Sequence, residues 1–188
     1  MDLLRKRQIL EALVGEFTSY EEELSEGYNT LSDTYVSSFF DAYAKGDKPY
    51  PVQIEYGAIG SVNTGIWEAL LQSGIEVMEI DTIQRIQTFF KKLQDFLDLF
   101  ARFEELYKDF VLPESGRDST FFYEEGGTEL LEKYSWYANQ LFDIGSKLGE
   151  LAVDAIETRA ILQAELKETI LLQQPDARFD ENNTYLPQ

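Results

Sequence analysis

Carboxylates are the most numerous side chains in this sequence that could do chemistry. The chain of 188 residues holds 35 Asp and Glu against 16 Lys and Arg, and it holds neither histidine nor cysteine. Carboxylates can act as general acids or bases and can bind hard cations. The chain lacks thiol nucleophiles, imidazole bases and the usual ligands of zinc, iron and copper.

No acidic motif has the spacing of a known type of site. The di-metal centres of helical bundles combine glutamates with Glu-x-x-His, which a chain without histidine cannot form. The stretch Asp-Glu-Asn-Asn at 180–183 resembles the opening of a calcium loop but lacks the later glycine and glutamate. We therefore predict no catalytic residue, no metal site and no cofactor, and we expect a protein that is not an enzyme. A carboxylate-based, metal-dependent hydrolase is the alternative from the enzyme class.

Aromatic side chains form the second group with functional potential. They occur in a short segment around Trp67 and in two loops expected at the ends of long helices. Aromatic rings with polar rims are common in recognition surfaces, and they also pack loops onto a helical core. The candidate interaction or packing residues are Trp67, Tyr50, Tyr56, Phe121, Phe122 and Tyr123.

Apolar residues recur every three or four positions in three long stretches, which predicts three long amphipathic helices. These helices are expected at 2–45, 81–112 and 128–173, with Gly46 and Pro113 as stop signals and Thr128 as a cap. The second helix carries a continuous phenylalanine face over 89–110. Such a face is most often core, and an apolar ligand pocket is the alternative.

The segments between the long helices are predicted to be loops at 46–62 and 113–127 and a short helix at 63–74. Pro49 and Pro51 exclude a regular helix in the first loop. The short helix has an apolar face around Trp67 and ends at Gly74, and it is too short to be stable without packing on a larger body.

Together these elements predict an all-α fold: an antiparallel helical bundle of three long helices plus one or two short helices. We expect a single helical-bundle domain at 1–172 and a flexible C-terminal tail at 173–188. Gly145 and Gly149 form a G-x-x-x-G pattern, which we interpret as the close approach of a neighbouring helix.

The formal net charge of −19 excludes classes of partner. A field of this sign repels the phosphates of nucleic acids and anionic lipid headgroups, so we expect no nucleic-acid partner. The sequence has no run of 18 apolar residues that would span a bilayer.

Residues 65–93, GIWEALLQSGIEVMEIDTIQRIQTFFKKL, resemble a recurrent segment of uncharacterised bacterial membrane-anchored proteins, and the whole resemblance covers about residues 3–112. The matching positions of the W-x-x-L-x-x-S-G-type motif and of the helix after it are Trp67, Leu70 or Leu71, Ser73, Gly74, Ile80, Asp81 and Ile86. In those proteins an N-terminal span precedes a long charged helix. The resemblance implies that the full-length protein is membrane-associated through an anchor missing from this chain, with the extracytoplasmic side favoured, and that this chain is soluble.

The sequence therefore favours a non-enzymatic soluble domain of a membrane-anchored bacterial protein that works in protein interaction or sensing. A protein is the expected partner, and the oligomeric state stays open. The alternative is a small-molecule sensor that binds an apolar ligand within the bundle, next to the phenylalanine face.

Overall fold

The computed structural model describes residues 2–55, 67–68 and 77–173. This part of the chain consists of helices, short turns, loops and one isolated β-bridge, which confirms the predicted all-α class. The predicted short helix at 63–74 and the predicted tail at 173–188 fall almost wholly outside the described residues. Of those two segments only Trp67, Glu68 and Gln173 are described, and all three are helical.

The described ranges hold the following elements with defined bounds. They are α1 (Leu3–Leu31), the π-helical η1 (Ser32–Ser37), α2 (Ser38–Ala44), α4 (Ile80–Leu106), the π-helical η4 (Tyr107–Val111), the 3-10 turns η5 (Leu112–Glu114), η6 (Ser119–Phe122) and η7 (Glu132–Tyr134), and α5 (Trp136–Gln173).

The predicted first helix is continuous from α1 through η1 to α2, so one helical rod covers Leu3 to Ala44. The rod ends as expected at Gly46, whose φ of 80° lies in the left-handed region that favours glycine. The amide of Gly46 donates to the carbonyl oxygen of Tyr43 and closes the last turn.

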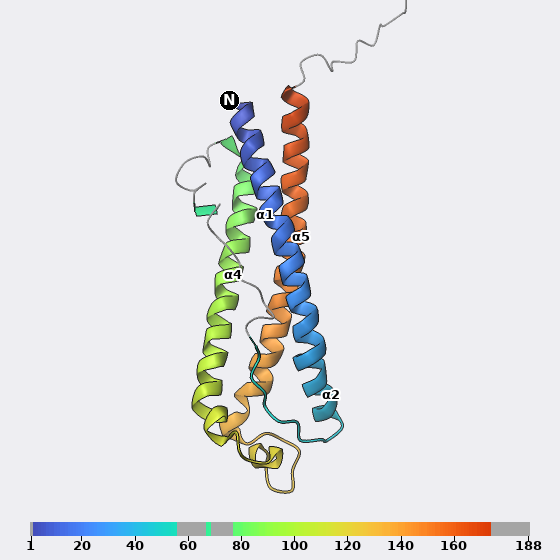
Figure 1. The fold of residues 1–188 in the computed structure, drawn as a ribbon, viewed down its shortest axis with the longest axis vertical. Coiled ribbons are helices and arrows are strands. Elements are labelled where there is room, and N and C mark those ends of the chain that lie inside the picture. The colour runs from blue at the N-terminus through green and yellow to red at the C-terminus, as the bar shows by residue number, and fades with distance from the viewer. Residues whose placement is uncertain (1, 56–66, 69–76, 174–188) are drawn as a thin grey trace, which may run out of the picture.

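The three long helices lie side by side, and α5 runs antiparallel to both others (Figure 1). The predicted antiparallel order does not extend to α1 and α4, which run in the same direction. Phe17, in the middle of α1, packs on Phe89, in the first half of α4, with ring centroids 4.9 Å apart. Two parallel helices require a connection that returns along the length of the bundle, and the segment between α2 and α4 is long enough to do so.

The described start of that return, residues 46–55, is a loop without a strand, as predicted. Tyrosine hydroxyl groups hold its backbone: Tyr123 donates to the carbonyl oxygen of Pro49 at 2.6 Å. The hydroxyl of Tyr137 donates to the carbonyl oxygen of Val52 at 3.0 Å and accepts from its amide at 3.1 Å. Side chains therefore satisfy backbone groups that have no ladder partner.

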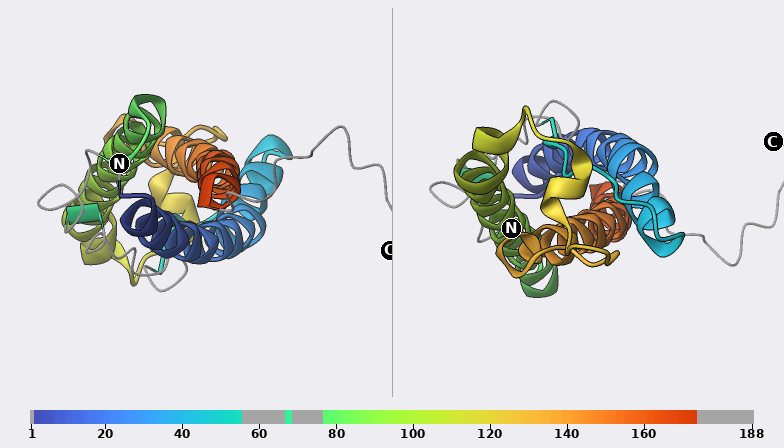
Figure 2. Two further views of the ribbon diagram at one scale, coloured as in Figure 1. Left: turned by 90° about the horizontal axis from the view of Figure 1, so that it is seen from above. Right: turned by 90° about the horizontal axis from the view of Figure 1, so that it is seen from below.

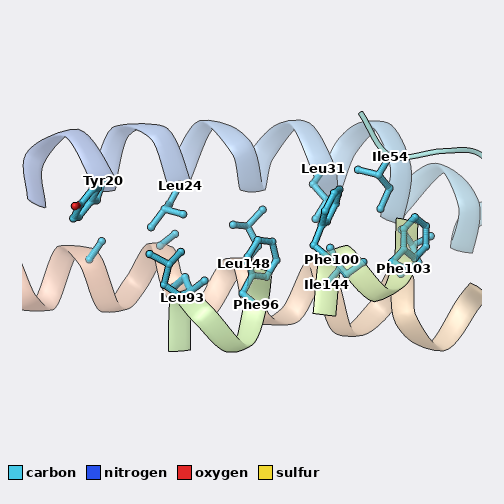
Figure 3. Close-up of a cluster of buried hydrophobic side chains, with 14 of the residues drawn as sticks. Tyr20, Leu24, Leu31, Ile54, Leu93, Phe96, Phe100, Phe103, Ile144 and Leu148 are labelled. Atoms are coloured by element: carbon cyan, nitrogen blue, oxygen red, sulfur yellow. The ribbon is translucent and has the colours of Figure 1, made fainter. Parts of the chain in front are cut away.

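The core lies along the axis between the three long helices (Figures 2 and 3). The predicted apolar ladders supply it, because spacings of three and four place one stripe of each helix toward the axis. The fully buried members include Leu10, Leu13, Phe17, Leu24 and Leu31 from α1, Ile86, Phe96 and Phe103 from α4, and Leu141, Ile144, Leu148, Ala155 and Leu162 from α5. Tyr28 follows Leu24 of α1 at the same helical spacing, but 37% of its surface is exposed.

The last helix begins later than predicted. Thr128 does not cap it, and α5 starts at Trp136. Residues 122–124 instead pair with residues 129–131: Leu131 donates its amide to Phe122, Glu124 donates to Glu129, and Tyr123 bridges to Leu130. Gly126, with a φ of 71°, makes the turn between the two segments. This pairing satisfies backbone groups that a helix starting at Thr128 would have used.

Candidate functional site

The outer face of α5 is apolar although it points away from the core. We define the α5 outer face as Phe142, Ser146, Gly149, Val153 and Ile156, which recur at helical spacings of four and three. Phe142 is 61% exposed, Val153 is 53% exposed and Ile156 is 42% exposed. Half of the exposed large hydrophobic side chains in the described ranges lie on α5, whereas α4 exposes only Ile80 at its first position.

A groove of about 810 Å³ runs beside this face. One wall consists of Tyr28, Ser32 and Val36 from α1 and η1, and the other belongs to α5, with Lys92 of α4 at its edge. An adjoining hollow of about 380 Å³ lies between Phe40 and Phe142 and includes Ala138. Phe142 lines both spaces, so the two hollows adjoin at its side chain along α5.

The two glycines of the G-x-x-x-G pattern determine the depth of the groove. A Cβ atom at Gly145 would lie 3.1 Å from Cγ2 of Val36, and one at Gly149 would lie 3.0 Å from Cε2 of Tyr28. The interpretation as a close helix approach is therefore confirmed. Because neither glycine has a side chain, Tyr28 and Val36 pack directly against the backbone of α5. No side chain at these two positions fills the groove between the helices.

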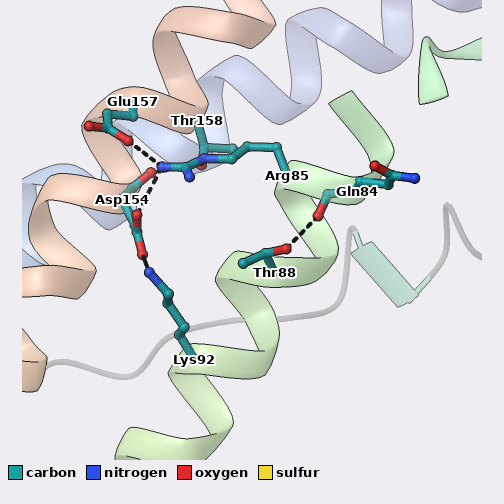
Figure 4. A network of polar contacts seen from close by, with 7 residues as sticks. All are labelled: Gln84, Arg85, Thr88, Lys92, Asp154, Glu157 and Thr158. Atoms are coloured by element: carbon teal, nitrogen blue, oxygen red, sulfur yellow. Dashed lines mark hydrogen bonds and ion pairs between the residues drawn. The ribbon is translucent and has the colours of Figure 1, made fainter. Parts of the chain in front are cut away.

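A balanced ion-pair network borders the outer face where α5 meets α4 (Figure 4). The buried carboxylate of Asp154 accepts from Arg85 at 2.8 Å and from Lys92 at 2.5 Å. Arg85 also contacts Glu157 at 2.5 Å and donates to the hydroxyl of Thr158 at 3.3 Å. Two cations and two anions compensate each other here, so the network fixes α4 against α5 and leaves no excess charge.

Four of the residues selected from the sequence meet at the end of the bundle where α4 ends and α5 begins. The ring centroids of Tyr50 and Phe122 lie 4.9 Å apart, and those of Phe121 and Phe122 lie 5.5 Å apart. Phe122 and Tyr123 are buried, Tyr50 is half-buried and Phe121 is 38% exposed beneath Arg117. Burial raises the pKa of the Tyr123 hydroxyl, which keeps it protonated as a hydrogen-bond donor to Pro49.

Trp67 does not join this cluster. Its side chain is 6% exposed and stacks on Phe90 of α4, with ring centroids 5.6 Å apart and an interplanar angle of 17°. This contact covers the α1–α4 side of the bundle, away from the α5 outer face. Tyr56, the sixth candidate, lies outside the described residues.

The carboxyl group of Glu16 is partly buried, and its pKa is raised above the ordinary value. Glu16 on α1 accepts from the hydroxyl of Tyr20 at 2.6 Å through Oε1, while its Oε2 is buried without a hydrogen-bond partner in the described structure. Burial raises the pKa of Glu16, and the hydrogen bond from Tyr20 partly offsets the rise. Within the described ranges, no group of three or more acidic side chains could hold a metal ion.

Sequence reasoning did not single out the α5 outer face. Its signal was present, since Phe142, Gly149 and Ile156 are seven residues apart and Val153 lies between them. One apolar stripe is enough to pack α5 into the core. The sequence pattern alone therefore gave no role to the second stripe, which forms the α5 outer face.

Comparison with known proteins gave no match to a family model, a curated protein or a solved structure. In the part of the chain that the structure describes, no helix is long and apolar enough to cross a bilayer.

Proposed function

We propose that this chain is a non-enzymatic protein-interaction domain that binds an amphipathic α-helix of another protein along the α5 outer face. The observation that carries the proposal is the row of exposed apolar side chains beside a continuous groove. Contiguous exposed apolar surface on a soluble protein is typical of interaction sites. A groove between two helices with anchors at spacings of three and four matches the helix-in-groove mode of recognition.

The packing of α5 into the core does not require the apolar side chains of the α5 outer face. The inner positions of the helix, including Leu141, Leu148 and Leu162, are already fully buried. The outer apolar side chains add nothing to that core, and no described element covers them. Their removal from water by a partner would contribute to affinity, since buried apolar surface stabilises by about 25 cal/mol per Å².

The phenylalanine face favours this proposal over the alternative of an apolar ligand within the bundle. Phe89, Phe96, Phe100 and Phe103 are at most 1% exposed. Their rings pack against one another and against α1 and α5, with Phe17 on Phe89 and Tyr137 on Phe103. A stripe that fills the core in this way has the ordinary role of a packed interior.

A selection from a library of helical peptides would test the proposal, with Phe142→Glu as the test variant. Leu4→Glu is a matched control, because Leu4 is 62% exposed and Phe142 is 61% exposed, and both lie on helices. We expect enriched peptides to bind the unmodified chain and Leu4→Glu equally and to lose at least tenfold in affinity for Phe142→Glu. Equal affinity for both variants would place binding elsewhere, and a selection without enrichment would contradict the proposed function.

We also propose, from the resemblance of residues 65–93 alone, that the domain acts at a membrane surface as part of a longer protein. Fractionation of cells that express the natural gene would test this, with the protein expected in the membrane fraction. Recovery of the whole product in the supernatant would contradict it.

A further inference from the structure

We infer that the helix bound on the α5 outer face carries basic side chains seven residues apart, which face Asp143 and Glu150. The inference rests on the proposed function and adds the chemistry of the partner. Asp143, Glu150 and Glu157 are exposed and follow one another at seven-residue intervals along α5. On a helix this spacing produces a nearly straight row, and the row lies next to Phe142, Gly149 and Ile156 on the side toward α4.

The three carboxylates of this row differ in whether a basic side chain pairs with them. Glu157 already contacts Arg85, and Asp154 holds both Arg85 and Lys92. Asp143 and Glu150 form no ion pair with any described residue, although Lys92 and Lys147 line a small hollow together with Glu150. Lys147, the only basic residue of α5 between them, lies further round the helix from the apolar positions. The rim of the groove therefore presents two carboxylates without a direct ion pair to a described residue, about two turns apart.

The opposite wall does not balance this rim. The residues of α1 and η1 that line the groove are Tyr28, Ser32 and Val36, none of which is charged. A bound helix therefore meets apolar contacts in the middle and neutral groups on the α1 side. On the α4 side it meets carboxylates, together with Lys92, which is already paired with Asp154. Complementary charge on one flank would set both the orientation and the specificity of such a helix.

The same charges exclude a second copy of this chain as the favoured occupant. Pairing two α5 outer faces would bring two rows of carboxylates together between molecules that each carry a formal net charge of −19. Like charges across an interface oppose association. A cationic helix gains from the same field, both in its rate of encounter and in its final contacts.

The length of the two adjoining hollows sets the length of the partner. The two hollows extend from Ala138 to Ile156 of α5. At 1.5 Å per residue this corresponds to about 27 Å, or about five helical turns. A helix of this length has room for four or five apolar anchors and for two basic residues that match Asp143 and Glu150.

Two designed peptides of about 21 residues test the inference directly. Both carry leucines at alternating spacings of three and four, and they differ only in whether lysine or glutamate occupies a flanking position every seven residues. Fluorescence anisotropy at low salt should show binding of the lysine peptide at least tenfold tighter than that of the glutamate peptide. The difference should shrink strongly at 0.5 M salt, because screening weakens exposed charge pairs.

The double variant D143K/E150K should abolish or reverse this preference. The control E105K/D109K changes the net charge by the same amount on α4 and η4, where both acidic residues are exposed and away from the groove. It should keep most of the preference. Circular dichroism should show the same helix content in both variants.

Each outcome separates the inference from the proposed function. Equal binding of both peptides would overturn the inference and leave a groove that binds helices through apolar contacts alone. A preference that both double variants reduce to the same degree would also overturn it, since the attraction would then come from net charge. Failure of both peptides to bind would overturn the inference and count against the proposed function as well.

Discussion

Lys6 on α1 and Glu165 on α5 form a buried ion pair, with Nζ and Oε1 2.7 Å apart and each side chain about one-twentieth exposed. Glu79, next to the start of α4, completes the contact, since its carboxylate lies 3.2 Å from Lys6 and its amide donates to Glu165 at 3.0 Å. One cation thus joins all three long helices near one end of the bundle.

Removal of one member of this pair should destabilise the fold strongly. Lys6→Met leaves the carboxylate of Glu165 buried without its cation, which typically costs about 3–5 kcal/mol. The double variant Lys6→Met/Glu165→Gln removes both charges and keeps an acceptor for the amide of Glu79, so it should recover much of the loss. Urea unfolding of the single and double variants measures both effects, and equal instability of the two would contradict the assignment.

The pH dependence of this ion pair follows from the pKa shifts of Lys6 and Glu165 in the folded protein. Burial alone would lower the pKa of Lys6, but its hydrogen bonds to Glu165 and Glu79 outweigh burial and raise it. Burial alone would raise the pKa of Glu165, but hydrogen bonds from Lys6 and other groups lower it. The stabilisation from this pair is therefore complete between about pH 4.5 and 10.5, the ordinary pKa values of the two groups. It is lost as pH falls through the folded pKa of Glu165, or rises through that of Lys6.

The contribution of Glu16 to stability should change with pH in the opposite direction to that of Glu165. Its folded pKa is raised, so ionisation above its ordinary value destabilises the native state relative to the unfolded chain. Glu16→Gln keeps an acceptor for the hydroxyl of Tyr20 and removes the charge, so it should stabilise by about 0.5 kcal/mol at pH 7. The gain should vanish near pH 3, where Glu16 is protonated in both states. Thermal unfolding at the two pH values measures it, and a loss of stability at pH 7 would disprove this account.

Tyr137→Phe should destabilise the protein although it removes a single oxygen atom. The hydroxyl of Tyr137 is the hydrogen-bond partner of both the amide and the carbonyl group of Val52, and its ring is fully buried. Leaving such groups without a partner costs about 1–3 kcal/mol. Tyr43→Phe is the control, since no hydrogen bond of the Tyr43 hydroxyl is present in the described structure; it should change stability by less than about 0.5 kcal/mol. Equal effects of the two variants would contradict the role of Tyr137.

Glycine to alanine substitutions should separate a free helical position from a close helix contact. A Cβ at Gly15 of α1 meets nothing within 4 Å, so Gly15→Ala should stabilise by about 0.5–1 kcal/mol through helix propensity. A Cβ at Gly145 would lie 3.1 Å from Val36, so Gly145→Ala should lose that gain and destabilise by about 1 kcal/mol. Chemical unfolding of both variants measures the contrast, and stabilisation by both would show that α1 yields at the contact.

The sequence was sufficient for the helices and the core because one stripe of each helix determines what is buried. It could not determine the relative direction of α1 and α4, since their stripes meet equally well in either direction once the connection is long enough. It also missed the start of α5. Leu131 and Tyr134 continue the spacing of Ala138 and Leu141, and periodicity cannot detect that the backbone around Gly126 pairs with itself instead. The α5 outer face needed the three-dimensional arrangement, because only this shows that no described element covers it.

Trp67 offers the sharpest separation between packing and binding. Its side chain is almost fully buried and stacks on Phe90, on the opposite side of the bundle from the α5 outer face. Trp67→Ala should therefore cost roughly 3–5 kcal/mol of stability, as expected for a large buried aromatic side chain. Under conditions where the variant is still folded, its affinity for the lysine peptide should equal that of the unmodified chain. A variant of normal stability that loses peptide binding would move the interaction surface from α5 to the Trp67 side of the bundle.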